Sequence, residues 1–260
     1  MFDLDDTLLW DERSIDEAFA ETCQEAKKKY ELDPEALEEE VRKAAKALYA
    51  TYDIYPFTQI IGVNPFEGLW GNFRDDDDNF RQLSAVVPTY RKGAWTNGLK
   101  AVGIDDPELG EELGELFPKI RRTKNYVYDE TYPVLKALKG KFKLLLLTNG
   151  SPDLQQEKLA GVPELPTYFD HVLISGTFGR GKPDPGLFQH ALDLLGVTNH
   201  ETIMVGDKLT TDIAGANRTG ITSVWLNRKD IERDHQIVPD YEIKRLREIH
   251  ALLDSLNSMK

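Results

Sequence analysis

Acidic side chains, a hydroxyl and a lysine occur at positions of this chain where a sheet could present them to a substrate. The residues are Asp3, Asp5, Thr148, Lys182, Asp207 and Asp212. Asp3 and Asp5 are two positions apart, so in an extended strand their carboxylates lie on one face and can approach one site. Thr148 and Asp207 each follow a short apolar run, and Lys182 lies in a Gly/Pro-rich loop.

This combination of groups suits reactions of phosphate esters. Carboxylates attract a hard cation such as Mg²⁺, which prefers oxygen ligands. With charge screened by the cation, a carboxylate can attack phosphorus and form an aspartyl-phosphate. A second carboxyl group can protonate the leaving oxygen and then activate water. A lysine and a threonine hydroxyl can bind the phosphoryl oxygens.

Each of these features also has an ordinary structural explanation. Two aspartates near a chain end usually form a solvated turn, and Thr-Asn-Gly after a strand is typical of a turn or a helix N-cap. A lysine in a loop such as 179–185 is usually solvated. A shared site is favoured because all of these residues fall at the same end of the predicted strands.

Those strands alternate with helices from about residue 129 onward. Predicted strands cover 2–4, 142–147, 171–175, 202–205 and 221–226, and predicted helices cover 129–138, 152–159, 185–195, 211–219 and 241–256. Short apolar strands separated by helices predict an α/β fold, a doubly wound parallel sheet with helices on both faces. Ligands of such sheets bind at the carboxyl ends of the strands.

The stretch from about residue 14 to residue 122 has helical periodicity instead. Ser14 with Glu17 predicts a capping box, and Asp33-Pro34 predicts a second helix start. The other elements expected there are an irregular stretch over 52–79 with a solvated acidic run at 75–78, and helices over 81–102 and 106–119. The predicted domains are a catalytic core of residues 1–13 plus 123–260 and an inserted all-helical domain of residues 14–122.

Composition limits the partners of the protein. The 260 residues include 32 Lys and Arg against 45 Asp and Glu, a formal net charge of −13. This charge argues against nucleic acid or an anionic membrane as a partner. Cys23 is the only cysteine, which excludes an intrachain disulfide. The first residues have neither the basic nor the apolar region typical of a secretory signal, so we expect none. We therefore expect a cytoplasmic protein acting on a small phosphorylated metabolite. No pattern indicates an oligomeric state.

Four ordered segments resemble the motifs of the haloacid dehalogenase (HAD) superfamily. They are Asp3-Leu4-Asp5-Asp6-Thr7-Leu8, Leu147-Thr148-Asn149-Gly150, Lys182-Pro183-Asp184-Pro185, and Gly206-Asp207 with Asp212. The resemblance spans the whole chain. It implies a HAD-like Rossmannoid core with an inserted helical cap in the C1 position.

The resemblance also implies catalytic roles for five residues. Asp3 is the expected nucleophile, and Asp5 is the expected general acid and base. Thr148 and Lys182 are expected to bind the transferring phosphoryl group, together with the backbone N–H of Asn149. Because dehalogenases and phosphonate hydrolases of the superfamily lack the second aspartate, Asp5 favours phosphoryl chemistry, although mutases keep it.

A metal site is implied by the same motifs. Asp3, the backbone carbonyl of Asp5, and Asp207 are expected to ligate Mg²⁺, for which Co²⁺ or Mn²⁺ can substitute. Asp212 is expected to support the metal shell or to orient Lys182.

The substrate is indicated less directly. Segments 66–73 and 149–159 resemble a Bacillus-type group of phosphoserine phosphatases, which implies a role in serine biosynthesis. Another small metabolite stays open as the substrate: a sugar phosphate, an acylneuraminate 9-phosphate or a nucleoside monophosphate. From a different class, a receiver-like phosphoacceptor module also places aspartates, a threonine and a lysine at sheet ends, but such modules lack a large insertion after the first strand.

Trp10, Arg91 and the segment 52–73 are candidates for substrate choice, although their aromatic residues also suit a cap core.

Only Met1 and Phe2 precede Asp3, whereas the family has several apolar residues there. Either the true start of the protein lies upstream, or the central strand is short and loses ladder hydrogen bonds and buried apolar area. We expect a chain extended by an apolar strand at this end to melt at a higher temperature than the present one. Thermal melts of the two forms test this expectation, and equal midpoints would contradict it.

Overall fold

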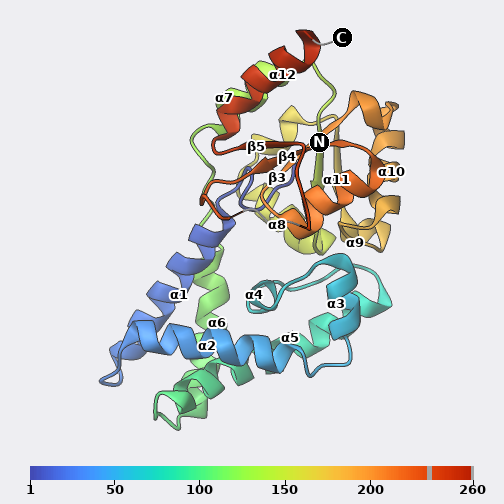
Figure 1. Ribbon diagram of the computed structural model, residues 1–260. Helices are drawn as coiled ribbons and strands as arrows, with labels where there is room; N and C mark the ends of the chain where they lie inside the picture. The colour runs from blue at the N-terminus through green and yellow to red at the C-terminus, as the bar shows by residue number, and fades with distance from the viewer. Residues whose placement is uncertain (233–235, 259–260) are drawn as a thin grey trace. The chain divides into compact units, whose positions relative to one another are not determined.

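The computed structural model describes residues 1–232 and 236–258 (Figure 1). Its contacts divide the chain into two compact units. The sheet unit contains residues 1–10, 127–149 and 162–260, and the helical unit contains residues 11–126 and 150–161. The domain boundaries predicted above stay a prediction. In the structure, the sheet unit ends its first segment at Trp10 and resumes at Val127. Residues 150–161 belong to the helical unit.

The sheet unit is built on parallel strands. They are β1 (Leu145–Thr148), β2 (His171–Ile174), β3 (Ile203–Gly206), β4 (Thr222–Leu226) and β5 (Tyr241–Ile243). β1 pairs with β2, β3 with β4, and β4 with β5, each in parallel. The predicted α/β fold with a parallel sheet is therefore confirmed.

The first residues of the chain join these two groups of strands. Phe2 forms parallel bridges to Leu146 of β1 and to Val205 of β3. The backbone N–H of Leu147 donates to the carbonyl of Phe2 at 2.8 Å, and the N–H of Asp3 donates to the carbonyl of Val205 at 3.0 Å. The predicted first strand thus has its place in the middle of the sheet, between β1 and β3, although its pairing ends at Asp3.

Helices connect the strands of this unit. They are α7 (Thr131–Leu138), α9 (Ser175–Phe178), α10 (Pro185–Leu195), α11 (Ala214–Thr219) and α12 (Ile249–Ser258), with 3₁₀ turns at Leu165–Tyr168, Asn199–Glu201 and Leu246–Glu248 and a π turn at Leu209–Ile213. α10 shows how local sequence sets the boundaries: the Asp184 carboxylate caps its first turn, Pro185 opens it, and Gly196 ends it at a φ of 60°.

Two predicted helices differ from the structure. The helix expected over 241–256 is wrong in its first half, since Tyr241–Ile243 is strand β5 and α12 begins only at Ile249. Residues 241–243 pair with β4, and this pairing between distant segments cannot be read from the local sequence. The N–H of Asn227, directly after β4, donates to the carbonyl of Ile243 at 2.8 Å. The helix expected over 211–219 starts as the π turn and becomes α-helical at Ala214.

The helical unit packs its helices around an aromatic core. Its helices are α1 (Asp11–Lys27), α2 (Pro34–Tyr49), α3 (Tyr55–Ile61), α4 (Pro65–Gly68), α5 (Asp78–Ala101), α6 (Pro107–Arg121) and α8 (Pro152–Ala160). The largest buried side chains of this core are Phe19, Trp70, Phe73, Tyr90, Trp95 and Phe117. Of the helices in the described residues, none has the length and apolar composition needed to cross a bilayer.

Two local predictions for this unit are corrected. Ser14 is not a cap, because α1 already begins at Asp11 and Ser14 lies buried within the helix. Glu17 instead accepts hydrogen bonds from Arg13 and from the hydroxyl of Tyr126. The stretch 52–79, expected to be irregular, contains α3 and α4.

The acidic run 75–78 does more than face solvent. The Asp75 carboxylate accepts hydrogen bonds from the Ser151 hydroxyl at 2.6 Å and from the Asp153 N–H at 2.8 Å, at the start of α8. Asp77 caps α5 through the N–H of Asn79. Carboxylates at helix starts satisfy free N–H groups there and complement the helix dipole. These contacts help to explain why α8 belongs with the helical unit.

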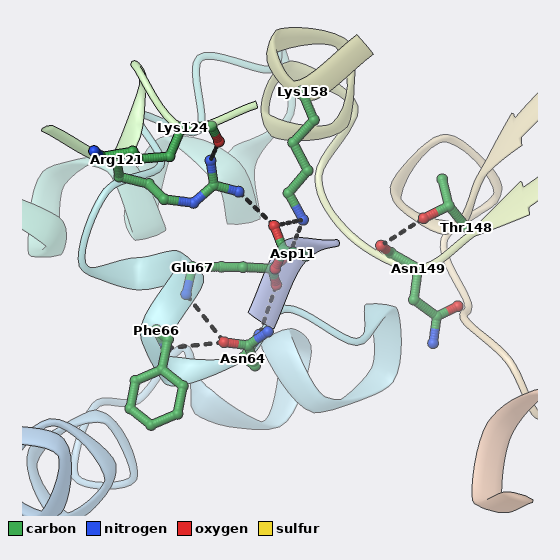
Figure 2. Close-up of polar contacts among 9 residues, drawn as sticks. All are labelled: Asp11, Asn64, Phe66, Glu67, Arg121, Lys124, Thr148, Asn149 and Lys158. Carbon is green, nitrogen blue, oxygen red and sulfur yellow. Dashed lines mark hydrogen bonds and ion pairs between the residues drawn. The ribbon is translucent and has the colours of Figure 1, made fainter. Parts of the chain in front are cut away.

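A buried group of four charged residues lies inside the helical unit (Figure 2). The ammonium of Lys158 is 3.0 Å from Glu67 Oε1 and 3.7 Å from Asp11 Oδ1, and the guanidinium of Arg121 pairs with Asp11. Glu67 also accepts the backbone N–H of Asn64 at 2.9 Å, which completes the capping box of α4. The two cations and two anions balance each other, as buried charges require.

Removing Lys158 from this group should destabilise the helical unit strongly. The change Lys158→Met leaves the buried carboxylates of Glu67 and Asp11 with too few cations, and we expect a loss of about 3–5 kcal/mol in the free energy of unfolding, measured by urea denaturation. Adding Glu67→Gln should recover part of that loss by restoring the charge balance. Lys43→Met, at an exposed lysine of α2, is the matched control and should change little. Equal stability of Lys158→Met and this control would contradict the expectation.

Candidate active site

The carboxyl ends of the parallel strands bring four of the predicted site residues together. Asp3 follows the bridge residue Phe2, Asp207 follows β3, and Asp212 and Lys182 lie in the connections that leave β3 and β2. Parallel strands end at the same edge of a sheet, so residues separated by about two hundred positions become neighbours there.

Lys182 is the centre of this cluster. Its ammonium lies 2.5 Å from Asp3 Oδ1 and 2.7 Å from Asp212 Oδ1, and it donates to the carbonyl of Leu147 at 2.8 Å. Three acceptors match the three N–H bonds of an ammonium group. The residue is only 5 % exposed, so these contacts stand in for the water that it has lost.

Asn149 holds the backbone of Lys182 in place. Its side-chain amide donates to the Lys182 carbonyl at 3.0 Å, and its amide oxygen accepts the Lys182 N–H at 2.7 Å. A Cβ at the neighbouring Gly181 would come within 2.9 Å of that amide oxygen, so the loop passes too close for a side chain. The expected role of the Asn149 backbone N–H stays a prediction, and the structure adds these contacts of its side chain with the Lys182 backbone.

Three carboxylates of this cluster can hold one cation. One oxygen each of Asp3, Asp207 and Asp212 lies within 4.8 Å of the other two. Carboxylate oxygens are the donors that Mg²⁺ prefers, and the ion commonly uses few protein carboxylates and several waters. The donor set therefore fits Mg²⁺. The side chain of Asp5 is not part of this group of oxygens.

Burial and mutual repulsion make this group unusual electrostatically. Burial raises the pKa of Asp3, the ammonium of Lys182 opposes this, and the carboxylate of Asp212 adds to it, for a net increase. Burial together with the charges of Asp3 and Asp212 raises the pKa of Asp207 well above its usual value. Burial alone would lower the pKa of Lys182, but Asp212 and Asp3 raise it above the usual value. With one ammonium for three carboxylates, the group lacks positive charge, and a divalent cation would balance it.

The side chain of Thr7 bridges the carboxylates of Asp3 and Asp207. Its buried hydroxyl lies 3.2 Å from Asp3 Oδ2 and 3.4 Å from Asp207 Oδ1. Its carbonyl accepts a hydrogen bond from Arg228 at 3.1 Å, and that guanidinium also pairs with Glu130. No role was predicted for Thr7 or Arg228, although Thr7 lies in a segment that carried the resemblance.

Trp225 and Gly206 complete the support of the acidic residues. The indole N–H of Trp225 donates to the backbone carbonyl of Asp207 at 2.8 Å. Asp212 Oδ2 accepts the N–H of Lys208 at 3.0 Å. A Cβ at Gly206 would lie only 2.3 Å from the same Asp212 oxygen, so only glycine leaves room for this carboxylate. The Gly-Asp pair of the motif thus has a steric reason for its glycine.

The other predicted residues lie close by in the chain without joining the cation group. Thr148 ends β1 and is buried, and its hydroxyl lies 3.4 Å from the carbonyl of Asn149 (Figure 2). Asp5 is half-buried in the turn that follows Asp3, where the N–H groups of Leu8 and Leu9 both donate to the carbonyl of Leu4.

A family model for haloacid dehalogenase-like hydrolases matches residues 1–220. The chain therefore belongs to the haloacid dehalogenase-like hydrolase family, and the resemblance seen in its motifs is confirmed.

Individual relatives are similar along most of the chain. The protein is 36 % identical over 250 residues to the phosphoserine phosphatase of Thermus thermophilus, which covers 96 % of each chain. It is 32 % identical over 182 residues to the N-acylneuraminate-9-phosphatase of Mus musculus, covering 68 % of this chain and 73 % of the mouse protein. Both relatives are phosphatases, which confirms the predicted enzyme class. The fold matches the magnesium-bound HAD-hydrolase YfnB from Bacillus subtilis with a TM-score of 0.68 at 20 % identity, over 97 % of this chain and 96 % of that one.

Replacing Gly206 with alanine should disturb the cation group specifically. The new methyl group must displace the Asp212 carboxylate, and disturbing groups that orient or form a metal site costs about 10–100-fold in metal affinity. Titration calorimetry of Mg²⁺ into the chelator-treated protein measures this loss.

The control is Gly140→Ala, at a turn glycine with a φ of 80° and no atom within 4 Å of the added Cβ. It should lower stability through backbone strain and leave Mg²⁺ affinity unchanged. Unchanged affinity in the Gly206→Ala protein would show that Asp212 has no part in the metal site.

Proposed function

We propose that the protein is a Mg²⁺-dependent phosphomonoester hydrolase that works through an aspartyl-phosphate on Asp3. The observation that carries this proposal is the buried contact of 2.5 Å between Asp3 and Lys182, inside a group of three carboxylates. A nucleophile next to a fixed ammonium meets an anionic phosphoryl group without prohibitive repulsion. Membership of the hydrolase family supports the same reading.

The first half of the reaction transfers the phosphoryl group to the enzyme. A carboxylate oxygen of Asp3 attacks phosphorus, and the bond from phosphorus to the ester oxygen breaks. The carboxyl group of Asp5 gives its proton to that leaving oxygen, so the product departs as a neutral alcohol. Lys182 and the hydroxyl of Thr148 hold the phosphoryl oxygens while charge develops on them.

The second half releases phosphate. Asp5, now a carboxylate, takes a proton from a water molecule as the water oxygen attacks phosphorus. The bond between phosphorus and Asp3 breaks, inorganic phosphate leaves, and both aspartates return to their starting protonation. Asn149 keeps Lys182 in position throughout, by the paired amide contacts described above.

Asp3, Asp207, Asp212 and the backbone carbonyl of Asp5 are the proposed holders of the cation. When bound, Mg²⁺ supplies positive charge that draws the substrate to an acidic site and stabilises the transferring group. Co²⁺ or Mn²⁺ can replace it, because both accept oxygen ligands.

O-phosphoserine is the proposed substrate, hydrolysed to serine and phosphate in serine biosynthesis in the cytoplasm. The support is the Thermus thermophilus phosphoserine phosphatase, which is similar along nearly the whole of both chains. The mouse N-acylneuraminate-9-phosphatase supports the alternative of a sugar-acid phosphate, over a shorter part of the chain. The receiver-like alternative has lost its support, because the matching family is one of hydrolases.

Turnover of a chromogenic phosphate ester, with and without Mg²⁺, tests the reaction. We expect multiple turnover only with the cation and none in Asp3→Asn. Asp5→Asn should lower kcat by about 10²–10⁴-fold, the usual contribution of a general acid and base. Asp193→Asn, at an exposed residue of α10, is the control and should keep full activity. Turnover that survives Asp3→Asn would contradict the mechanism.

A panel of phosphorylated metabolites tests the substrate separately. The expected result is the highest kcat/KM for phosphoserine, with Asp3→Asn as the blank. Faster cleavage of an acylneuraminate phosphate or a sugar phosphate would remove the assignment to phosphoserine and leave the phosphatase mechanism standing.

A further inference from the structure

A cavity of about 370 Å³ opens between α5 and α6 of the helical unit. Pro88, Gly114 and Pro118 give it short side chains, and charged residues, among them Arg91, Lys119 and Arg122, complete its lining. A Cβ at Gly114 would lie 3.2 Å from the backbone of Arg91, so the two helices approach closely beside the cavity. Its size is within the range of small-ligand pockets.

Arg91 lines this cavity, and the carboxylate of Glu157 is the negative charge that acts on its guanidinium. Its guanidinium donates to the carbonyls of Gly71 at 2.5 Å and Gly68 at 3.4 Å. Within the described residues, no carboxylate lies within the 4.0 Å of an ion pair with it. Burial and the charge of Arg122 lower the pKa of Arg91 to about 10. A guanidinium placed in this way is stabilised by any anion that reaches it.

Arg122 is a second cation on the same cavity. Its Nε pairs with Glu157 at 2.5 Å and its Nη2 donates to the carbonyl of Trp70 at 2.8 Å, which accounts for two of its five N–H groups. These contacts fix the guanidinium plane and leave further donors to bind a ligand. A fixed fork of donors of this kind matches the oxygens of a carboxylate or a phosphate.

The remaining charges of the lining do not cancel the two arginines. Lys92 and Glu111 pair with each other at 2.5 Å, and Lys119 and Glu115 are of opposite sign. Glu157 pairs with Arg122, so one positive charge is left in excess, and Arg91 is the guanidinium without an ion pair within the described residues. The protein has a formal net charge of −13, so this positively charged cavity differs in sign from the molecule as a whole and attracts anions locally.

We infer that this cavity binds a small oxyanion, a carboxylate or a phosphate, between the guanidinium groups of Arg91 and Arg122. The inference goes beyond the proposed phosphatase reaction and does not depend on it, because every residue involved lies in the helical unit.

Calorimetric titration of the full chain with sodium phosphate or with sodium succinate tests this site. The protein is kept free of metal with a chelator, so that the acidic cluster around Asp3 repels both probes. Sodium chloride at equal ionic strength measures general salt effects. We expect saturable binding of at least one probe, weakened about tenfold or more in Arg122→Gln, because a charge-assisted hydrogen bond is lost. The two probes show whether phosphate, carboxylate or both are accepted.

Two further variants keep the test decisive. Arg91→Lys retains the charge and loses the planar fork, so binding should weaken even though the net charge is unchanged. Lys100→Gln removes a cation of α5 that pairs with Asp105 outside the cavity, and its binding should equal that of the wild type. Binding no stronger than that of chloride would overturn the inference. Equal affinities in Arg122→Gln, Arg91→Lys and the wild type would also overturn it, whatever the phosphatase assays show.

Discussion

The ammonium of Lys182, buried between Asp3 and Asp212, is the interaction on which the site depends. Taking three charged groups out of water is costly, and the cost is offset only when hydrogen bonds are nearly complete. Here the carbonyl of Leu147 serves as the third acceptor, and Asn149 fixes the backbone of the lysine. Without the ammonium, the carboxylates would repel one another in a poorly solvated pocket.

That interaction requires a parallel sheet with the first residues of the chain in its middle. Phe2 lies between β1 and β3, so Asp3 emerges beside the ends of both strands. Asp207 emerges from β3 itself, and the indole of Trp225 on β4 fixes its backbone. The sheet thus supplies position, while the connecting loops supply the charged groups.

The three polar clusters of the molecule, around Lys158, Lys182 and Arg91, differ in their balance of positive and negative charge. The group around Lys158 has equal numbers of cations and anions joined by ion pairs, which suits stability. The group around Lys182 has an excess of carboxylates, which a cation can balance. The cavity lined by Arg91 and Arg122 has one positive charge more than its ion pairs neutralise, which an anion can balance. A buried charge is costly unless an opposite charge lies beside it, so the sign of the excess charge in a cluster indicates the opposite sign for its ligand.

The sequence by itself determined the order of strands and helices, the parallel sheet, and the residue types at its carboxyl edge, because apolar periodicity and turn residues act locally. It failed for Tyr241–Ile243, where a neighbouring strand decided the outcome, and for Ser14, where the helix began earlier. Only the tertiary structure decided that the Asn149 side chain clamps Lys182. It alone revealed the room that Gly206 leaves for a carboxylate, since both depend on contacts between segments far apart in the chain.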